Sequence, residues 1–160
     1  MIKILKNSVL AGVLIALSGC AGAMPEYNSS KSTFIVFKTP TLKYADQGFV
    51  SRASSETKVE IYSSGQSVMR LRILPSQVCM SSLACMSKAD FNKKVLASST
   101  YPSAILEHIF NGEPIFGGKN MQGSGSNFTQ NIGSINYSVN GGNISFSDSS
   151  NGVKIKVRGV

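Results

Sequence analysis

Three cysteines and one histidine are the first residues of this chain to consider as nucleophiles, general bases or metal ligands. A Ser-His-Asp or Cys-His arrangement would have to use His108, the single histidine, because nucleophilic catalysis needs a neighbouring base. The acids show no spacing that indicates a carboxylate pair of the kind glycosidases use. The eight acids are Glu26, Asp46, Glu56, Glu60, Asp90, Glu107, Glu113 and Asp148. We therefore expect no catalytic residue, no enzyme activity and no cofactor.

Cys20 ends a segment that has the three zones of a secretory signal. Lys3 and Lys6 make a positive start, residues 9–17 form an apolar run, and small residues precede the cysteine. The run is shorter than the ~20 apolar residues that a membrane-spanning helix needs. The tetrapeptide Leu17-Ser18-Gly19-Cys20 resembles the bacterial lipobox, which implies cleavage before Cys20 and acylation of its thiol. The alternative is an ordinary signal peptide with a cysteine near its cleavage site.

Cleavage there predicts a signal peptide over residues 1–19, a lipidated cysteine with a flexible tether over 20–32, and one domain over 33–160. Loss of the two signal lysines lowers the formal net charge from +8 to +6. Two or more acyl chains make a stable membrane anchor, so membrane lipid is the first expected partner. The basic residues are scattered, so we expect no nucleic-acid partner, and we expect a monomer. Ala21 favours the outer membrane, because enteric retention signals usually place an aspartate after the acylated cysteine.

Export also bears on Cys79 and Cys85, which five residues separate. A disulfide is the favoured interpretation of such a pair in a compartment that permits disulfides. A metal site is the alternative, but it would need further ligands beside the two thiolates.

Alternating apolar residues predict the strands that must form a core. A short apolar run covers residues 34–37, and residues 59–62 alternate. Met69, Leu71 and Ile73 share one face of the next segment, with two arginines on the other. Residues 63–67 between these two segments are predicted to be a hairpin loop, with Gly65 as its permissive residue.

The period changes in the middle of the chain, where two helices are predicted. Ser87 and Asp90 make a start like a capping box for a helix near 87–97. The second helix has Pro102 at its first position and Gly112 at its stop. His108 lies off the apolar face of this helix and is predicted to be a surface residue. The apolar face comprises Ile105, Leu106, Ile109 and Phe110.

The last third is predicted to return to strands after a loop over residues 117–127. Segments 135–139, 144–146 and 153–158 each alternate between apolar and polar residues, with turns between them. This pattern indicates an antiparallel sheet that is covered on one face. The order of strands, helices and strands predicts an α+β fold with the helices on the apolar face of a curved sheet.

Three segments, in this order, resemble the family of the outer-membrane lipoprotein receptor LolB. They are the hairpin 59–73, the proline-led helix followed by Gly112-Glu113-Pro114, and the strands that contain Gln130, Tyr137 and the basic residues of 144–158. The resemblance covers residues 34–158. It implies a strongly curved antiparallel sheet, an unclosed half-barrel, with two to three helices covering its concave face. It also implies a protein that takes lipoproteins from a periplasmic LolA-like carrier and helps to place them in the outer membrane.

The resemblance implies an apolar cavity that holds acyl chains of lipoprotein cargo during transfer. Its lining would comprise Ile61, Met69, Leu71, Ile73, Ile105, Leu106, Ile109, Phe110, Tyr137 and Phe146. The same residues would have the same pattern in a filled core, so the alternative stays open. The family inserts a leucine of its first hairpin loop into the membrane. This chain has no leucine there, and Gly65, Gln66 and Val68 are the insertion candidates.

Two other classes of protein stay open at this point. One is an interaction lipoprotein with an immunoglobulin-like sandwich, against which the two predicted helices count. The other is a lipopolysaccharide-assembly lipoprotein that braces a barrel.

Overall fold

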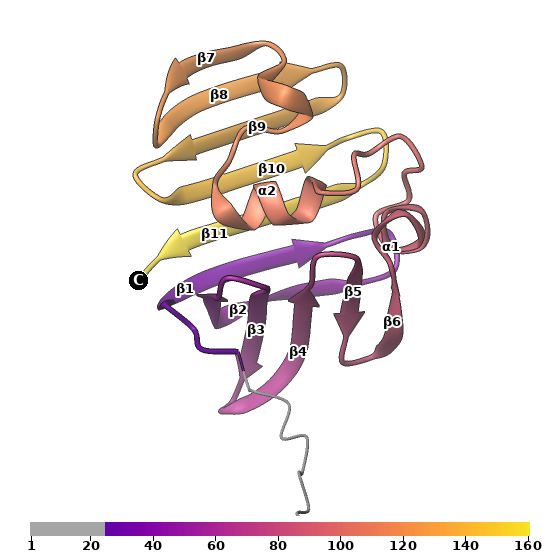
Figure 1. Ribbon diagram of the computed structural model, residues 1–160, viewed down its shortest axis with the longest axis vertical. Helices are drawn as coiled ribbons and strands as arrows, with labels where there is room; N and C mark the ends of the chain where they lie inside the picture. The colour runs from indigo at the N-terminus through magenta and orange to yellow at the C-terminus, as the bar shows by residue number, and fades with distance from the viewer. Residues whose placement is uncertain (1–24) are drawn as a thin grey trace, which may run out of the picture.

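The structure is a computed structural model, and it describes residues 25–160. Cys20 and the predicted signal peptide lie outside the described residues. All eleven strands of the described part belong to one antiparallel sheet, whose two edges, β6 and β7, do not meet (Figure 1). The fold is therefore an open curved sheet with two helices, broadly α+β but mostly β. A sandwich of two sheets is excluded for this part of the chain.

The sheet order is β6-β5-β4-β3-β2-β1-β11-β10-β9-β8-β7, so the strands pair with their chain neighbours except where β1 meets β11. This pairing joins the two ends of the chain at the middle of the sheet. The strands are β1 (Ser29–Lys38), β2 (Lys43–Arg52), β3 (Thr57–Ser63), β4 (Gln66–Ile73), β5 (Gln77–Met80), β6 (Leu83–Ser87), β7 (Met121–Ser124), β8 (Asn127–Ile132), β9 (Ile135–Asn140), β10 (Asn143–Asp148) and β11 (Val153–Gly159).

The predicted hairpin is confirmed as β3 and β4, joined by a two-residue turn. Ser64 and Gly65 both have positive φ, 50° and 79°, as the hairpin turn that matches strand twist requires. The register shifts between Ile61 and Tyr62, where Val68 is the extra residue of a bulge. Met69, Leu71 and Ile73 point into the core as predicted.

Gly48 marks a close approach between the backbones of β2 and β3. In β2, pairing with β3 begins at Gly48, which lies opposite Ile61. A Cβ at Gly48 would lie 2.0 Å from the carbonyl oxygen of Glu60 and 2.9 Å from Ile35 Cδ1. Only a residue without a side chain allows the β3 backbone to come this close.

The two helices are shorter than predicted. Helix α1 (Lys88–Lys94) begins after Ser87, whose side chain accepts a hydrogen bond from the Asp90 amide, so the predicted cap is confirmed. Helix α2 (Ile105–Asn111) ends at Gly112 in the left-handed conformation, also as predicted. The prediction that Pro102 is its first residue is wrong. Pro102 lies in the preceding turn, where its carbonyl accepts from the Ile105 amide at 3.0 Å.

Two segments predicted to be irregular are strands. The loop predicted over 117–127 contains the single 3-10 turn Phe116–Gly118 and all of β7. Strand β7 is an edge exposed on both faces, so its stability comes from backbone pairing with β8 and needs no apolar alternation. The predicted tether is also too long, since residues 29–32 are paired with β2.

One buried cluster fills the space between the helices and the sheet. All of its fully buried members lie between Ile35 and Val157, and all the strands lie between Ser29 and Gly159. Residues 25–160 therefore hold the sheet and the core that the structure describes. No helix of residues 25–160 combines the length and the apolar character needed to cross a membrane.

The predicted disulfide is present and joins Cys79 of β5 to Cys85 of β6. It closes a short loop at one edge of the sheet, where each strand has few neighbours.

We expect the double variant Cys79→Ser/Cys85→Ser to lower the free energy of unfolding by about 2 kcal/mol, because the reduced chain gains loop entropy when unfolded. Urea unfolding followed by circular dichroism measures this. The wild-type protein in reductant is the control and should match the variant; equal midpoints for the oxidised wild type and the variant would contradict the prediction.

Candidate functional site

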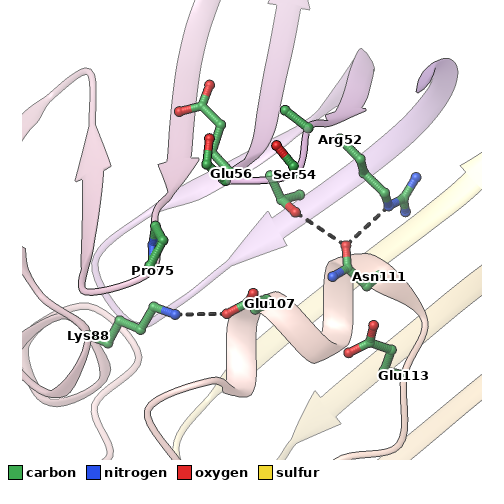
Figure 2. A pocket seen from close by; sticks show the side chains of 11 residues that line it. Arg52, Ser54, Glu56, Pro75, Lys88, Glu107, Asn111 and Glu113 are labelled. Carbon is green, nitrogen blue, oxygen red and sulfur yellow. Dashed lines mark hydrogen bonds and ion pairs between the residues drawn. The ribbon is translucent and has the colours of Figure 1, made fainter. Parts of the chain in front are cut away.

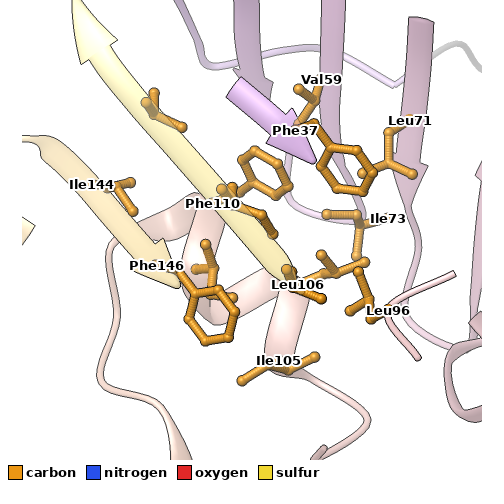
Figure 3. Close-up of a cluster of buried hydrophobic side chains, with 14 of the residues drawn as sticks. Phe37, Val59, Leu71, Ile73, Leu96, Ile105, Leu106, Phe110, Ile144 and Phe146 are labelled. Atoms are coloured by element: carbon orange, nitrogen blue, oxygen red, sulfur yellow. The ribbon is translucent and has the colours of Figure 1, made fainter. Parts of the chain in front are cut away.

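Helix α2 covers the apolar face of the sheet with four buried side chains: Ile105, Leu106, Ile109 and Phe110 (Figure 3). These four and the other six residues predicted to line a cavity lie in the same buried cluster, and each of the ten is between 0 and 3% exposed. They belong to one packed cluster, and none of them lines any of the cavities described below. In this conformation they form a filled core beneath a helical cover.

A polar cavity of about 550 Å³ opens at the side of α2, between the β2–β3 turn, the turn after β4 and the start of α1 (Figure 2). Its charged lining residues are Arg52, Glu56, Lys88, Glu107 and Glu113. We call this cavity the polar mouth. Its walls are hydrophilic, so it suits the polar part of a ligand and not an acyl chain.

A smaller cavity of about 150 Å³ lies beside the C-terminal end of α2. Its apolar walls are the core residues Val50, Val139, Ile144 and Val157. Thr33 also lines it, with a hydroxyl that is buried and has no hydrogen-bond partner among the described residues. We call this cavity the apolar recess.

Arg52 and Asn111 line both the polar mouth and the apolar recess. Arg52 Nε donates to Asn111 Oδ1 at 3.1 Å, and its guanidinium also donates to the Phe110 carbonyl. Thr57 Oγ1 donates to the same Asn111 oxygen at 3.2 Å. These contacts hold the C-terminal end of α2 onto β2 and separate the two cavities. We call them the latch.

A second polar contact holds the other half of α2. Lys88, the first residue of α1, is buried and its Nζ lies 2.8 Å from Glu107 Oε2. The helix is thus held at the polar mouth by side-chain contacts to Arg52 and Lys88. Such side-chain contacts can be replaced by hydrogen bonds to a ligand or to water. The strands of the sheet beneath are instead joined by backbone hydrogen bonds.

A buried charge cluster forms the wall of the mouth beside the latch. Glu56 accepts hydrogen bonds from Tyr27 and from Arg72, whose Nη2 lies 2.6 Å away. Burial would raise the pKa of Glu56, but these hydrogen bonds outweigh it and the pKa is lowered. Burial and the bond to Glu56 raise the pKa of Tyr27 to about 12. Glu56 is therefore charged and fully bonded at neutral pH.

The residues of the latch were not predicted from the sequence. Arg52 is an inward-facing cation at the end of β2, a strand with a single fully buried aliphatic side chain, so periodicity did not reveal it. Its partner Asn111 lies 59 residues away. An arginine two positions after Val50, on the same side of a strand, is the signal that could have found it.

The remaining predicted residues lie elsewhere. Gly65, Gln66 and Val68 are exposed at the tip of the β3–β4 hairpin, and Val68 is 41% exposed. His108 has a half-exposed side chain, in partial agreement with the surface prediction, with Nε2 3.9 Å from Glu113 Oε2. Within residues 25–160, no group of three potential ligands is placed to hold a metal ion.

A scan of protein-family models and a search of curated protein sequences gave no match to this chain. The case for a function therefore depends on the residues and geometry described above.

Proposed function

We propose that this protein is a membrane-anchored lipoprotein, similar to LolB, that binds acyl chains or acylated proteins beneath α2 and helps to place them in the outer membrane. The observation that carries the proposal is the latch. It holds a short apolar helix over an apolar sheet face and lies between a polar mouth and an apolar recess.

The architecture supports a half-barrel whose concave face is covered by helices. An acyl chain that displaced α2 would meet the six buried side chains that the sheet contributes, namely Ile61, Met69, Leu71, Ile73, Tyr137 and Phe146. Burial of apolar area is favourable by ~25 cal/mol per Å², which would offset the loss of helix packing without any cofactor. The unpaired Thr33 hydroxyl in the recess is available to a carbonyl oxygen of the ligand.

The test uses residues 21–160, which contain all the strands and core residues that the structure describes. We expect mass spectrometry of the purified domain to find co-purified lipid, and an apolar fluorescent dye to bind and be displaced by fatty acid. A domain that carries no lipid and binds no dye would refute acyl-chain binding. Depletion of the protein in cells should misplace outer-membrane lipoproteins; correct placement would refute the LolB-like role and leave acyl-chain binding intact.

Arg52→Ala should increase dye binding several-fold and lower the free energy of unfolding by about 1–3 kcal/mol, since the Phe110 carbonyl and Asn111 lose their donor. Dye titration and urea unfolding measure the two effects. Arg70→Ala is the matched control, because Arg70 bonds to Glu60 on β3, away from α2. Dye binding that is equal in both variants would show that the latch does not close the interior.

A further inference from the structure

The outer face of the three central strands carries many positive charges and no negative charge. This face, opposite the core, is formed by β11, β1 and β2, and we call it the basic face. Its ten residues are Phe34, Val36, Lys38, Lys43, Ala45, Gln47, Phe49, Lys154, Lys156 and Arg158. Five of them are cations and none is an acid, which distinguishes the basic face from the rest of the sheet.

Three lysines stand in one row across the basic face. Lys38 lies directly opposite Lys154 on one side and directly opposite Lys43 on the other. Like charges in such positions are destabilising. No carboxylate among the described residues forms an ion pair with any of the five cations. These unmatched and exposed charges would attract an anionic partner from outside the domain.

On the neighbouring strands β3 and β4, the cations of the same sheet form ion pairs with acids. On β3, Glu60 pairs with Lys58 at 3.0 Å and with Arg70 at 2.8 Å. Arg72 pairs with Glu56 at 2.6 Å. The cations of β3 and β4 are thus matched by acids, whereas those of β11, β1 and β2 are not.

Apolar side chains lie between the unmatched cations. Phe34 and Val36 are half-buried on β1, and the Arg158 guanidinium lies 5.9 Å from the centre of the Phe34 ring. Phe49 is 41% exposed and packs edge-on against Tyr62 with ring centres 5.9 Å apart. Basic residues with exposed aromatic and aliphatic groups between them suit the headgroup region of an anionic bilayer.

The chain enters the domain at the outer face. The Tyr27 ring lies 4.6 Å from Lys58 Nζ, and the next residue, Asn28, donates its amide to the Arg52 carbonyl at 2.8 Å. Six residues separate Tyr27 from Cys20, and the seven residue-to-residue steps between the two span at most ~25 Å when fully extended. An anchor on Cys20 would therefore keep this side of the sheet within one domain diameter of the bilayer.

We infer that the basic face docks on the surface of a bilayer that contains anionic phospholipid. The choice of a membrane as the partner rests on the proposed anchor; the inference does not require that the domain binds acyl chains. Docking would turn the sheet's outer face to the lipid and leave α2, on the opposite face, free to meet a periplasmic partner.

The test measures binding of residues 21–160, which lack the acylated cysteine, to vesicles. We expect co-sedimentation with vesicles of phosphatidylcholine mixed with phosphatidylglycerol, little with phosphatidylcholine alone, and release by salt. The variant Lys38→Gln/Lys43→Gln/Lys154→Gln should bind roughly a hundredfold more weakly, about fivefold for each lysine. Its melting temperature should equal or exceed that of the wild type, because the row of like charges is gone.

Lys93→Gln/Lys94→Gln/Lys119→Gln is the matched control, since it removes the same charge from three exposed positions outside the basic face. It should bind as the wild type does. Equal binding by both triple variants, equal binding to the two kinds of vesicle, or binding to soluble polyglutamate but not to vesicles would each overturn the inference. Dye binding should be unchanged in both triple lysine variants. A failure of acyl-chain binding is therefore distinguished from a failure of docking.

Discussion

Asp148→Ala is expected to lower the free energy of unfolding by about 3–5 kcal/mol, the first of the two largest effects that the structure predicts. Asp148 is 2% exposed at the end of β10. It accepts from the Tyr101 hydroxyl at 2.5 Å, the Ser134 hydroxyl at 2.6 Å and the Asn151 amide group at 2.7 Å. The backbone amide of Ser150 donates to it at 3.0 Å. Alanine would leave these donors without an acceptor in a largely buried place.

Replacement of Asp148 should also affect the functional site. Tyr101 stands in the connection between α1 and α2, with its ring 6.1 Å from that of Phe146. Asp148 therefore holds the segment that leads into α2 against the β10 end of the sheet. Tyr101→Phe removes one donor and keeps the ring, so it should cost about 1 kcal/mol. Urea unfolding of the three proteins gives the comparison, and similar losses for the two variants would contradict the role assigned to Asp148.

The effect of Asp148 should depend on pH. Burial alone would raise the pKa of Asp148, but the hydrogen bonds from Ser134, Tyr101 and Asn151 outweigh it and lower the pKa below the ordinary 3.8. A lowered pKa in the folded state means that the stabilisation is complete above about pH 4 and is lost as the pH falls through the folded value. The gap in unfolding free energy between wild type and Asp148→Ala should therefore be constant from pH 5 to 7 and should narrow below about pH 4. A gap that does not narrow would show that folding does not lower the pKa of Asp148.

Phe110→Ala is expected to have a comparable effect, a loss of about 3–5 kcal/mol, because it leaves a cavity where α2 meets the sheet. The side chain is fully buried, and it lies among the apolar side chains of the concave face, near Leu106 of its own helix (Figure 3). If the space beneath α2 takes acyl chains, the same variant should bind more apolar dye than the wild type.

Two variants control this prediction. Phe110→Leu keeps most of the volume and should lose about 1 kcal/mol. Phe49→Ala truncates the same type of side chain on the outer face, where it is 41% exposed, and should lose less than about 1 kcal/mol. Urea midpoints and dye titration measure both effects. A loss below about 1 kcal/mol for Phe110→Ala would mean that α2 is not part of a packed core.

Local patterns predicted the parts of the fold in which one face is regularly apolar. The hairpin of β3 and β4, the last three strands and the buried face of α2 follow from side-chain period, and Ser87 and Gly112 from the chemistry of helix ends. Strands β2, β5, β6 and β7 were not predicted. Gly48 replaces an inward side chain in β2, β5 and β6 have only four and five residues, and β7 is exposed on both faces.

The residues of the candidate site divide in the same way. The ten apolar residues were found because residues on a buried face recur with the period of their strand or helix. The sequence could not show whether they line a cavity or fill a core. Arg52 and Asn111 leave no such trace, since a single polar contact across 59 residues has no period. The basic face needed the register, because Lys38, Lys43 and Lys154 become one row only when β1 pairs with both β2 and β11.

The sequence alone determined the types of residue available for chemistry and the elements that carry them. It predicted no catalytic set, a disulfide between Cys79 and Cys85, and acylation of Cys20, which lies outside the described residues. Only the tertiary structure decided which side chains meet: the disulfide bond itself, the latch between β2 and α2, the two cavities on either side of it, and the unmatched charges of the outer face. The physical reason is range, because periodicity and capping act over a few residues, whereas a site is assembled by pairing between segments far apart in the chain.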